Sequence, residues 1–511
     1  MAVAKINSAT LVGLDSYPVT VEVNVEEKGF PSFAIVGLAS KEVEESKERV
    51  RSAIKNSKYY FPKHRITVNL APADLPKKGS AFDLPIALGI IIASSQLSTY
   101  PADTSLKLFV GELSLDAKIR PIPGILPLVF YAQKKGFTHV YIPKRNNKEA
   151  SIVSNIKIYG VRNLSRIIHH LEGRNLIYPE KKVDFGSILN QFQDHEVDMS
   201  DVIGQDRAKR ALTIAAAGGH NLIFVGPPGS GKTMLARVLP SIMPKLTPEE
   251  ALEITKIYSI SGELGSNKHI ISTRPFRSPH HTTSRIGLIG GGSKIMPGEI
   301  SLAHRGVLFM DEFPELPRHV LEALRQPLED GVVTISRSSG TLTYPANFML
   351  VAASNPCPCG NFGNPKKVCS CSLYTIEKYK KRISGPILDR IDIHIEVPLV
   401  EASKLSLRQK DGKSSKEIRE IVQASRDAQK ERFKGLNIVC NADMGARDIK
   451  KFCNLDSKSE QLLNFSTNKY GFSARTYFKI IKVARTIADL ECRKEMLAED
   501  VQEAIGLRVK G

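Results

Sequence analysis

Apolar and polar residues follow three different patterns along the chain. Residues 1–180 alternate strand-like runs, such as TVEVNV at 20–25 and HRITVNLA at 64–71, with helix-like runs such as KEVEESKERVRSAIKNS at 41–57. Apolar residues at every second position predict strands, and apolar residues at every third or fourth position predict helices. We therefore expect an α+β domain over residues 1–180.

The remaining chain changes pattern twice. A polar connector with little periodicity follows the first domain, and we assign residues 181–201 to a linker. From 202 to 400 short apolar strands alternate with helices, which is typical of a parallel α/β sheet. From 401 to 511 the chain is charged and helical, as in SSKEIREIVQASRDAQKERFK at 414–434. The predicted fold class is α/β, with a helical domain at the C-terminal side.

Composition and charge narrow the class of protein. The 511 residues are 42% hydrophobic and 24% charged, which is the balance of a globular protein, and the formal net charge is +19. On charge alone, a solvated lysine-rich surface and a polyanionic partner such as nucleic acid explain the excess equally well. The start of the chain lacks a secretory signal, the longest apolar run (84–94) is too short to cross a bilayer, and the seven cysteines fit a reducing compartment. We expect a cytoplasmic protein without a membrane partner.

The most specific motif is NLIFVGPPGSGKTMLARVL at 221–239, an apolar strand, a glycine-rich loop and a helix. Glycines in such a loop let backbone N–H groups face phosphates, Lys232 reaches the β- and γ-phosphate oxygens, and the Thr233 hydroxyl binds Mg²⁺. The predicted ATP contacts of this segment are Gly226, Pro227, Pro228, Gly229, Ser230, Gly231, Lys232, Thr233 and Met234.

Two later strands also end in polar residues. GVLFMDE at 306–312 predicts that Asp311 holds Mg²⁺ together with Thr233 and that Glu312 polarises the attacking water. NFMLVAASNP at 347–356 ends in Asn355, whose amide would orient that water or would simply be a turn residue. Asp311 and Glu312, following the phosphate loop by about 80 residues in the chain, complete the pattern of a nucleotide hydrolase.

Two arginines are candidates for contacts with the γ-phosphate. Arg390 follows a helical stretch in GPILDRIDIHIEVP at 385–398, and Arg475 begins a predicted helix at 471–490. A planar guanidinium can bind several γ-phosphate oxygens while charge moves, and such a residue accelerates hydrolysis by roughly 10³–10⁵.

These motifs, in this order, resemble the AAA+ ATPases. DVIGQDRAKRAL at 201–212 resembles the segment that AAA+ proteins place against adenine, which implies contacts from Val202 and Ile203. RPFRSPHHTTS at 274–284 and the stretches 290–312 and 321–348 resemble the ComM/YifB family of the magnesium-chelatase-like branch, and the resemblance covers nearly the whole chain.

The resemblance implies roles for the polar residues already named. ATP and Mg²⁺ would be the cofactors, and residues 401–511 would form the lid. Asn355 would be sensor 1, Arg390 a finger that acts on a neighbouring subunit, and Arg475 sensor 2, acting either in its own subunit or in the neighbour. A finger of this kind implies a ring, by analogy a homo-hexamer.

The resemblance also bears on the substrate. GVVTISRSSGTLTYP at 331–345 predicts a hairpin with Arg337 near its tip. The corresponding hairpin of related ATPases points into the central pore, so Arg337 would meet DNA phosphates there; an ordinary surface hairpin is the alternative. We expect a DNA motor of the helicase or branch-migration type, used in recombination or natural transformation. The alternatives are a remodelling chaperone or chelatase-type ATPase without a DNA substrate, and a Lon-like ATP-dependent protease.

The first domain resembles the Lon protease domain, of the ribosomal S5 domain 2-like fold. LPKKGSAFDLPIALG at 75–89 keeps the turn before the Lon nucleophile, with Ser80 as its nearest hydroxyl, but Leu126 occupies the position of the required lysine. Because a serine without a base is a poor nucleophile at neutral pH, we expect this domain to be proteolytically inactive.

Four cysteines follow Asn355 with the spacing C-x-C-x₉-C-x-C, at Cys357, Cys359, Cys369 and Cys371. Two thiolate pairs closed by a turn suit tetrahedral Zn²⁺, and an iron–sulfur cluster, which uses the same ligands, is an alternative. A redox role would need a thiol of lowered pKa. A disulfide is disfavoured by the reducing compartment. We expect a structural zinc knuckle whose removal impairs assembly or coupling more than nucleotide binding.

Overall fold

A computed structural model describes residues 3–26, 30–77, 79–97, 104–183, 185–190, 197–265, 269–292, 295–337, 340–364, 367–400 and 412–508. The chain forms two compact units. The first consists of Met1–Gln191 and Pro248–Ser272, and the second of Phe192–Thr247 and Thr273–Gly511. Residues 248–272, which the sequence pattern assigns to the second predicted domain, therefore pack with the first unit.

The first unit is built on a mixed sheet with the strand order β3-β4-β2-β1-β5-β8-β9. The pairs β4-β2 and β2-β1 are antiparallel and the remaining pairs are parallel. Its strands are β1 (Ala4–Val12), β2 (Asp15–Glu26), β3 (Ser32–Val36), β4 (Arg65–Ala71), β5 (Lys107–Phe109), β8 (His139–Pro143) and β9 (Lys157–Val161), and β6 (Glu112–Leu113) pairs separately with β7 (Ile119–Arg120).

The first unit also contains helices. They are α1 (Lys41–Glu44), α2 (Ser46–Asn56), α3 (Asp83–Ala93), α4 (Ile125–Lys134), α5 (Asn147–Ala150), α6 (Leu164–Leu171), α7 (Phe185–Asn190) and α10 (Pro248–Ser261), with a 3₁₀ turn at Lys144–Asn146. Helix α3 is the apolar run of the sequence, and it is buried from Asp83 to Ile91 because it packs on both β1 and β2.

Helix α10 is fastened to the first unit by buried polar contacts. The Ser259 hydroxyl donates to Glu149 Oε2 at 2.7 Å, and the backbone N of Gly124 donates to the Ser259 carbonyl at 2.8 Å. Burial raises the pKa of Glu149, so its hydrogen bonds to Ser259 and Asn146 compensate for lost water. The two contacts of Ser259 join segments more than a hundred residues apart, and periodicity along the chain does not reveal such contacts.

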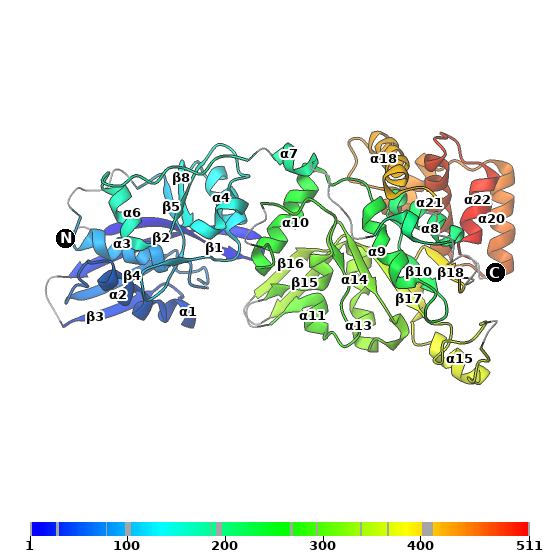
Figure 1. Cartoon of the computed structure of the whole chain (residues 1–511), viewed down its shortest axis with the longest axis horizontal. Helices are drawn as coiled ribbons and strands as arrows, with labels where there is room; N and C mark the ends of the chain where they lie inside the picture. Colours follow the sequence, from blue (N-terminus) through cyan, green and yellow to red (C-terminus); the bar gives the residue numbers. More distant parts are fainter. Residues whose placement is uncertain are drawn as a thin grey trace. The chain divides into compact units, whose positions relative to one another are not determined.

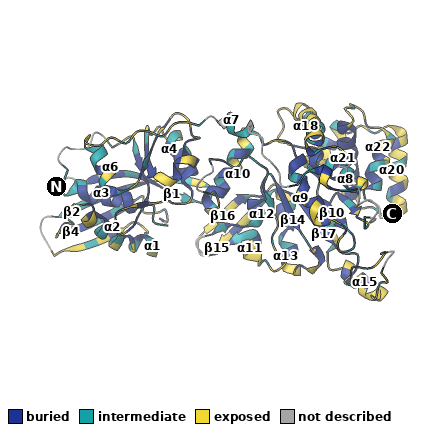
Figure 2. Ribbon diagram, viewed as in Figure 1, coloured by how far each residue is buried: buried dark blue, intermediate teal, exposed yellow. Residues whose placement is uncertain are grey.

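The second unit contains a parallel sheet with the strand order β11-β14-β17-β10-β18. The strands are β11 (Phe276–Arg277), β14 (Val307–Met310), β17 (Met349–Ser354), β10 (Leu222–Val225) and β18 (Ile393–Glu396). Figure 2 shows β10, β14 and β17 largely buried, and all four residues of β14 and all six of β17 are buried. Continuous apolar runs are typical of parallel strands covered on both faces. The predicted fold class, α/β with a parallel sheet, is confirmed.

The second unit also contains helices and short hairpins. They are α8 (Asp206–Gly218), α9 (Lys232–Ile242), α11 (Arg285–Ile289), α12 (Glu299–Leu302), α13 (Arg318–Ala323), α14 (Arg325–Asp330), α15 (Leu373–Lys380) and α16 (Gly385–Leu388), the pairs β12 (Gly290–Gly291) with β13 (Met296–Pro297) and β15 (Val332–Arg337) with β16 (Gly340–Pro345), and 3₁₀ turns at Met199–Asp201, Phe313–Glu315 and Asn441–Asp443.

The C-terminal part is helical, as predicted. Its helices are α18 (Ser415–Arg432), α19 (Ala446–Phe452), α20 (Ser457–Tyr470), α21 (Ala474–Leu490) and α22 (Ala498–Gly506), gathered at one end of the second unit in Figure 1. Helices α18 and α21 pack on α8, and their apolar side chains join the core of the sheet. Within the described residues, the helices that the chain forms are too short or too polar for any of them to cross a membrane.

Candidate nucleotide site and cysteine cluster

The glycine-rich loop joins β10 to α9 as the motif predicts. A side chain at Gly226 would place its Cβ only 2.2 Å from the carbonyl oxygen of Val397, so this close approach of two backbones requires glycine. Lys232 begins α9 and is buried, and its Nζ donates to the carbonyl oxygens of Gly226 at 2.6 Å and Pro227 at 2.9 Å. Burial lowers the pKa of Lys232, so a phosphate at this position would stabilise the charged ammonium.

The two polar strand ends meet at this loop. The Thr233 hydroxyl donates to Asp311 Oδ2 at 3.1 Å, although the two residues are 78 positions apart. Hydroxyl and carboxylate oxygens are the ligand types that Mg²⁺ takes in nucleotide sites, so these two residues fit a magnesium ion. Asn355, at the end of β17, places Oδ1 at 3.3 Å from Lys232 Nζ, because β17 pairs directly with β10.

Glu312 occupies a strained position beside Asp311. Its φ of 48° lies in the left-handed region, which non-glycine residues rarely adopt, and its backbone N donates to Asp311 Oδ1 at 2.9 Å. The exposed Glu312 carboxylate lies 3.5 Å from His281 Nδ1. Such strain is often kept where a side chain must be aimed at a substrate. The predictions from sequence assign His281 no role, and only the fold brings it to Glu312.

A cavity of about 860 Å³ opens beside the glycine-rich loop. Its lining residues are Gly204, Gln205, Asp206, Arg207, Val225, Gly226, Pro227, Pro356, Phe362, Gly363, Lys380, Glu396, Val397, Pro398, Leu399 and Val400. Gln205 connects the lining residue Pro398 to the glycine-rich loop, because its Nε2 donates to the Pro398 carbonyl at 2.7 Å and to the Ser230 carbonyl at 3.3 Å. The segment resembling an adenine-binding element thus borders the cavity through Gly204–Arg207, while Val202 lies in the core and Ile203 is half-buried.

The two candidate arginines meet at one carboxylate. Arg475 donates to Glu329 Oε1 at 2.7 Å, and Arg390 donates to Glu329 Oε2. The hydrogen bond from Arg390 is the main cause of the lowered pKa of Glu329, and the charge of Arg475 adds to it. All three residues line a second cavity of about 640 Å³, whose described lining includes no residue of the glycine-rich loop. The sequence offered no signal for Glu329.

A buried ion pair supports the segment that carries Arg390. Lys479 Nζ of α21 lies 2.6 Å from Asp392 Oδ1, and the backbone N of Asn221 donates to Asp392 Oδ2 at 2.9 Å. Burial by itself would raise the pKa of Asp392, but the Lys479 and His220 side chains hold it well below its usual range. The arginine-bearing turn is therefore tied both to the start of β10 and to the C-terminal helices.

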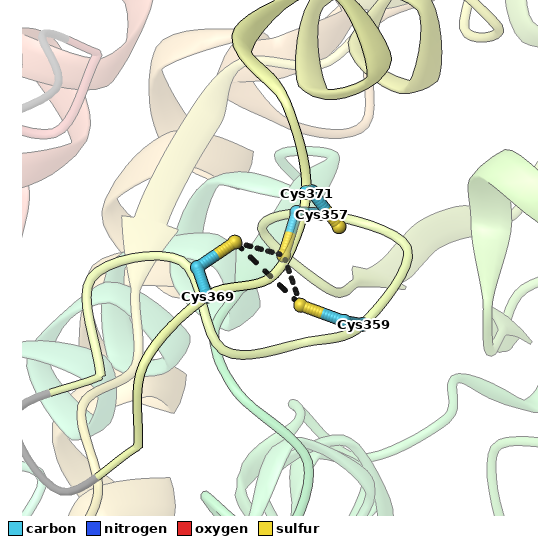
Figure 3. Close-up of side chains that lie close together, drawn as sticks. All are labelled: Cys357, Cys359, Cys369 and Cys371. Atoms are coloured by element: carbon cyan, nitrogen blue, oxygen red, sulfur yellow. Dashed lines mark hydrogen bonds between the residues drawn. The ribbon is translucent and has the colours of Figure 1, made fainter.

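The four predicted cysteine ligands come together (Figure 3). Their Sγ atoms lie within 4.8 Å of one another. The separations are 3.4 Å for Cys357–Cys359, 3.7 Å for Cys357–Cys369 and 3.6 Å for Cys359–Cys369. Tetrahedral zinc with Zn–S bonds of about 2.3 Å would require S···S separations of about 3.8 Å. A disulfide would need about 2.05 Å, and all four thiols are free. The geometry fits a tetrahedral thiolate site.

The remaining predicted positions lie elsewhere. Arg337 is exposed at the end of β15, beside the turn of the β15–β16 hairpin, whose residues 338–339 lie outside the described part. In the first unit, the Ser80 hydroxyl donates to Glu112 Oε2, and Leu126 is fully buried in α4.

Comparison with known proteins decides the family. Residues 198–405 match the family described as "Magnesium chelatase, subunit ChlI", residues 21–146 match "Subunit ChlI of Mg-chelatase", and residues 412–508 match its C-terminal part. The chain is 43% identical to "Competence protein ComM" of Haemophilus influenzae, over 99% of this chain and 98% of that protein. The chain belongs to the ComM/YifB family of magnesium-chelatase-like AAA+ ATPases.

Two other relatives differ in how much of the chain they match. "Uncharacterized protein YifB" of Escherichia coli is 41% identical over 99% of this chain and 97% of its own length. "Magnesium-chelatase 67 kDa subunit" of Chlorobaculum parvum is 28% identical, but only over 31% of this chain and 23% of that protein. Membership in the AAA+ family indicates ATP with Mg²⁺ as the nucleotide and ion, and members of this family typically form oligomers.

Proposed function

We propose that this protein is an ATP-hydrolysing ring motor that acts on DNA, as a helicase or branch-migration enzyme. The observation that carries the hydrolytic part is the meeting of Lys232, Thr233, Asp311 and Asn355 at one edge of the parallel sheet. These residues lie at the start of α9 and directly after β14 and β17. They supply the groups that nucleotide hydrolysis needs: a cation, two ligands for Mg²⁺ and a polar side chain for water.

Each residue has a distinct part in the proposed reaction. Lys232 would exchange its two backbone carbonyl partners for the β- and γ-phosphates. Thr233 and Asp311 would hold Mg²⁺, which on binding neutralises charge on the phosphates. Glu312 would accept a hydrogen bond from the attacking water and polarise it, and Asn355 would orient that water toward the γ-phosphate.

The arrangement of Arg390 and Arg475 supports the proposal of a ring. Both bind Glu329 and line a cavity separate from the one beside the glycine-rich loop. Two cations held together on one carboxylate suit a surface that meets the γ-phosphate of a neighbouring subunit. We propose that both act across the subunit interface of a homo-hexamer, with Arg390 as the finger and Arg475 as sensor 2.

DNA as the substrate rests on three observations. A relative of nearly full length carries the name "Competence protein ComM", the chain has a net charge of +19, and Arg337 is exposed near the tip of a hairpin. Arginine on a hairpin contacts phosphate oxygens without reading sequence, which suits a translocating enzyme. Recombination during natural transformation is the process we propose for it.

The cysteine cluster completes the proposal. We assign it a structural Zn²⁺ held by Cys357, Cys359, Cys369 and Cys371, because the sulfur separations match a tetrahedral site. The metal would supply rigidity and take no part in the chemistry, since all four coordination positions are filled by protein.

ATP turnover with and without single-stranded, duplex and branched DNA, over a salt series, tests the proposal. We expect DNA to stimulate hydrolysis, with a stimulation that falls steeply with salt because phosphate contacts release counterions. Lys232→Ala should abolish nucleotide binding. ATPase activity indifferent to every DNA at low salt would refute the DNA motor.

A second candidate is a remodelling chaperone or chelatase-type ATPase without a DNA substrate. The match of residues 198–405 to a family named after a magnesium chelatase subunit favours it. This candidate predicts the DNA-independent ATPase result, together with stimulation by a protein partner.

A further inference from the structure

The cysteine loop, defined here as residues 356–364, lies directly against the glycine-rich loop. Gly360 is buried with a φ of 78°, and a Cβ added there would lie 2.6 Å from Cδ and 2.7 Å from Cγ of Pro228. Real Cβ atoms do not approach other heavy atoms so closely, so the backbone of the cysteine loop and the Pro228 ring are in van der Waals contact. The loop that carries Cys357 and Cys359 therefore touches the element that would hold the phosphates.

The cysteine loop also forms one wall of the 860 Å³ cavity beside the glycine-rich loop. Pro356, Phe362 and Gly363 line it, together with Lys380 of α15, facing Gly204–Arg207 and Val397–Val400. Pockets for ligands of drug size are typically about 300–1,000 Å³, which is the range into which this cavity falls. A nucleotide with its phosphates on Gly226 and Lys232 would have this cavity available for its base and ribose.

Phe362 is the aromatic residue of this wall. It is 42% exposed although large apolar side chains are usually covered. Its backbone N donates to Cys357 Sγ at 3.3 Å, and Lys380 Nζ lies 5.5 Å from the centre of its ring. The hydrogen bond to a metal-ligand sulfur fixes the backbone of Phe362, and the cation contact restrains its ring.

We propose that the metal-held cysteine loop is a wall of the nucleotide pocket and that Phe362 packs against the base of the bound nucleotide. The metal then governs nucleotide affinity by holding Phe362 and Gly360 in place. This inference rests on the proposed ATP site and the proposed metal, and it replaces the expectation that removing the metal impairs assembly or coupling more than nucleotide binding.

The test is the dissociation constant of ATP, measured by calorimetry on the full chain loaded with zinc. Stacking of a base on an aromatic ring is worth about 1–3 kcal/mol, so Phe362→Ala should weaken ATP binding by roughly 5- to 150-fold. Phe362→Tyr should restore binding. Tyr374→Ala is the matched control, because Tyr374 is a 73% exposed aromatic residue of α15 that is not among the residues lining the cavity.

Binding of inorganic tripolyphosphate distinguishes contacts to the phosphates from contacts to the base. It should bind wild-type and Phe362→Ala protein equally, since it has no base, and lose binding in Lys232→Ala. Removing zinc with a chelator, verified by metal analysis, should weaken ATP binding of the wild-type protein and have a much smaller effect on Phe362→Ala.

The outcomes distinguish this inference from the proposed function. Unchanged ATP affinity in Phe362→Ala, with binding lost in Lys232→Ala, would refute the wall and leave the ATPase standing. Weakening of tripolyphosphate and ATP to the same extent would also refute contact with the base. Failure of the wild-type protein to bind ATP would instead overturn the proposed function.

Discussion

The buried pair of Asp392 and Lys479 offers the most direct test of how the arginine-bearing turn is held. The Asp392 side chain is 8% exposed and that of Lys479 is 16% exposed, with 2.6 Å between carboxylate and ammonium. Asp392→Asn removes the counter-charge of Lys479 while keeping the shape of the side chain. Breaking one partner of a buried pair typically costs about 3–5 kcal/mol, because the other charge stays buried without compensation.

Urea unfolding followed by far-UV circular dichroism measures this cost, since the chain has no tryptophan to report by fluorescence. We expect the free energy of unfolding of the second unit to fall by about 3 kcal/mol or more. The double variant Asp392→Asn/Lys479→Met should recover most of the loss, because Lys479 no longer leaves a buried ammonium without its counter-charge. The control is Glu315→Gln, which breaks an exposed pair with Arg382 and should cost less than about 1 kcal/mol.

The pair also predicts a pH dependence. The folded pKa of Asp392 lies below its ordinary value of 3.8, so its stabilisation is fully present above that value and is lost as the pH falls toward the folded pKa. The acid limb of the stability curve should therefore flatten in Asp392→Asn. A loss of less than about 1 kcal/mol at neutral pH, or an unchanged acid limb, would refute this account of the pair.

Four further predictions concern the site. Glu312→Gln should keep ATP affinity within about threefold and lose hydrolysis by at least roughly a hundredfold, which binding and turnover assays on the same sample check; equal loss of both would contradict its role. Glu329→Gln removes the carboxylate charge, 47% exposed, that holds Arg390 and Arg475. Because both arginines are proposed to act on a neighbouring subunit, the chain concentration that gives half-maximal ATPase activity should fall by up to about fivefold. A rise in that concentration would count against the idea that Glu329 restrains the two arginines. Arg337→Ala should lower the slope of log affinity for DNA against log salt by about 1 without changing DNA-free turnover; an unchanged slope would exclude a phosphate contact. Metal analysis should find one zinc per chain in colourless protein, whereas visible absorption with iron would replace zinc by an iron–sulfur cluster.

The sequence by itself determined the local chemistry of this protein. The glycine-rich loop, the acidic strand end at Asp311 and the cysteine spacing are short motifs, and their neighbours along the chain decide their geometry. Even the contact of Thr233 with Asp311, 78 positions apart, was predictable, because parallel strands place their carboxyl ends at one edge of a sheet. The patterns of apolar and polar residues predicted the α/β class and the helical C-terminal part, because these too depend on neighbours along the chain.

Only the tertiary structure decided which distant segments share a surface. Glu329 meets Arg390 and Arg475 across 61 and 146 positions, α10 packs into the first unit, and Gly360 rests on Pro228. Periodicity tells which face of an element is buried, but not which other element buries it. That choice depends on packing over the whole unit, and in this protein it brings the cysteine loop against the glycine-rich loop.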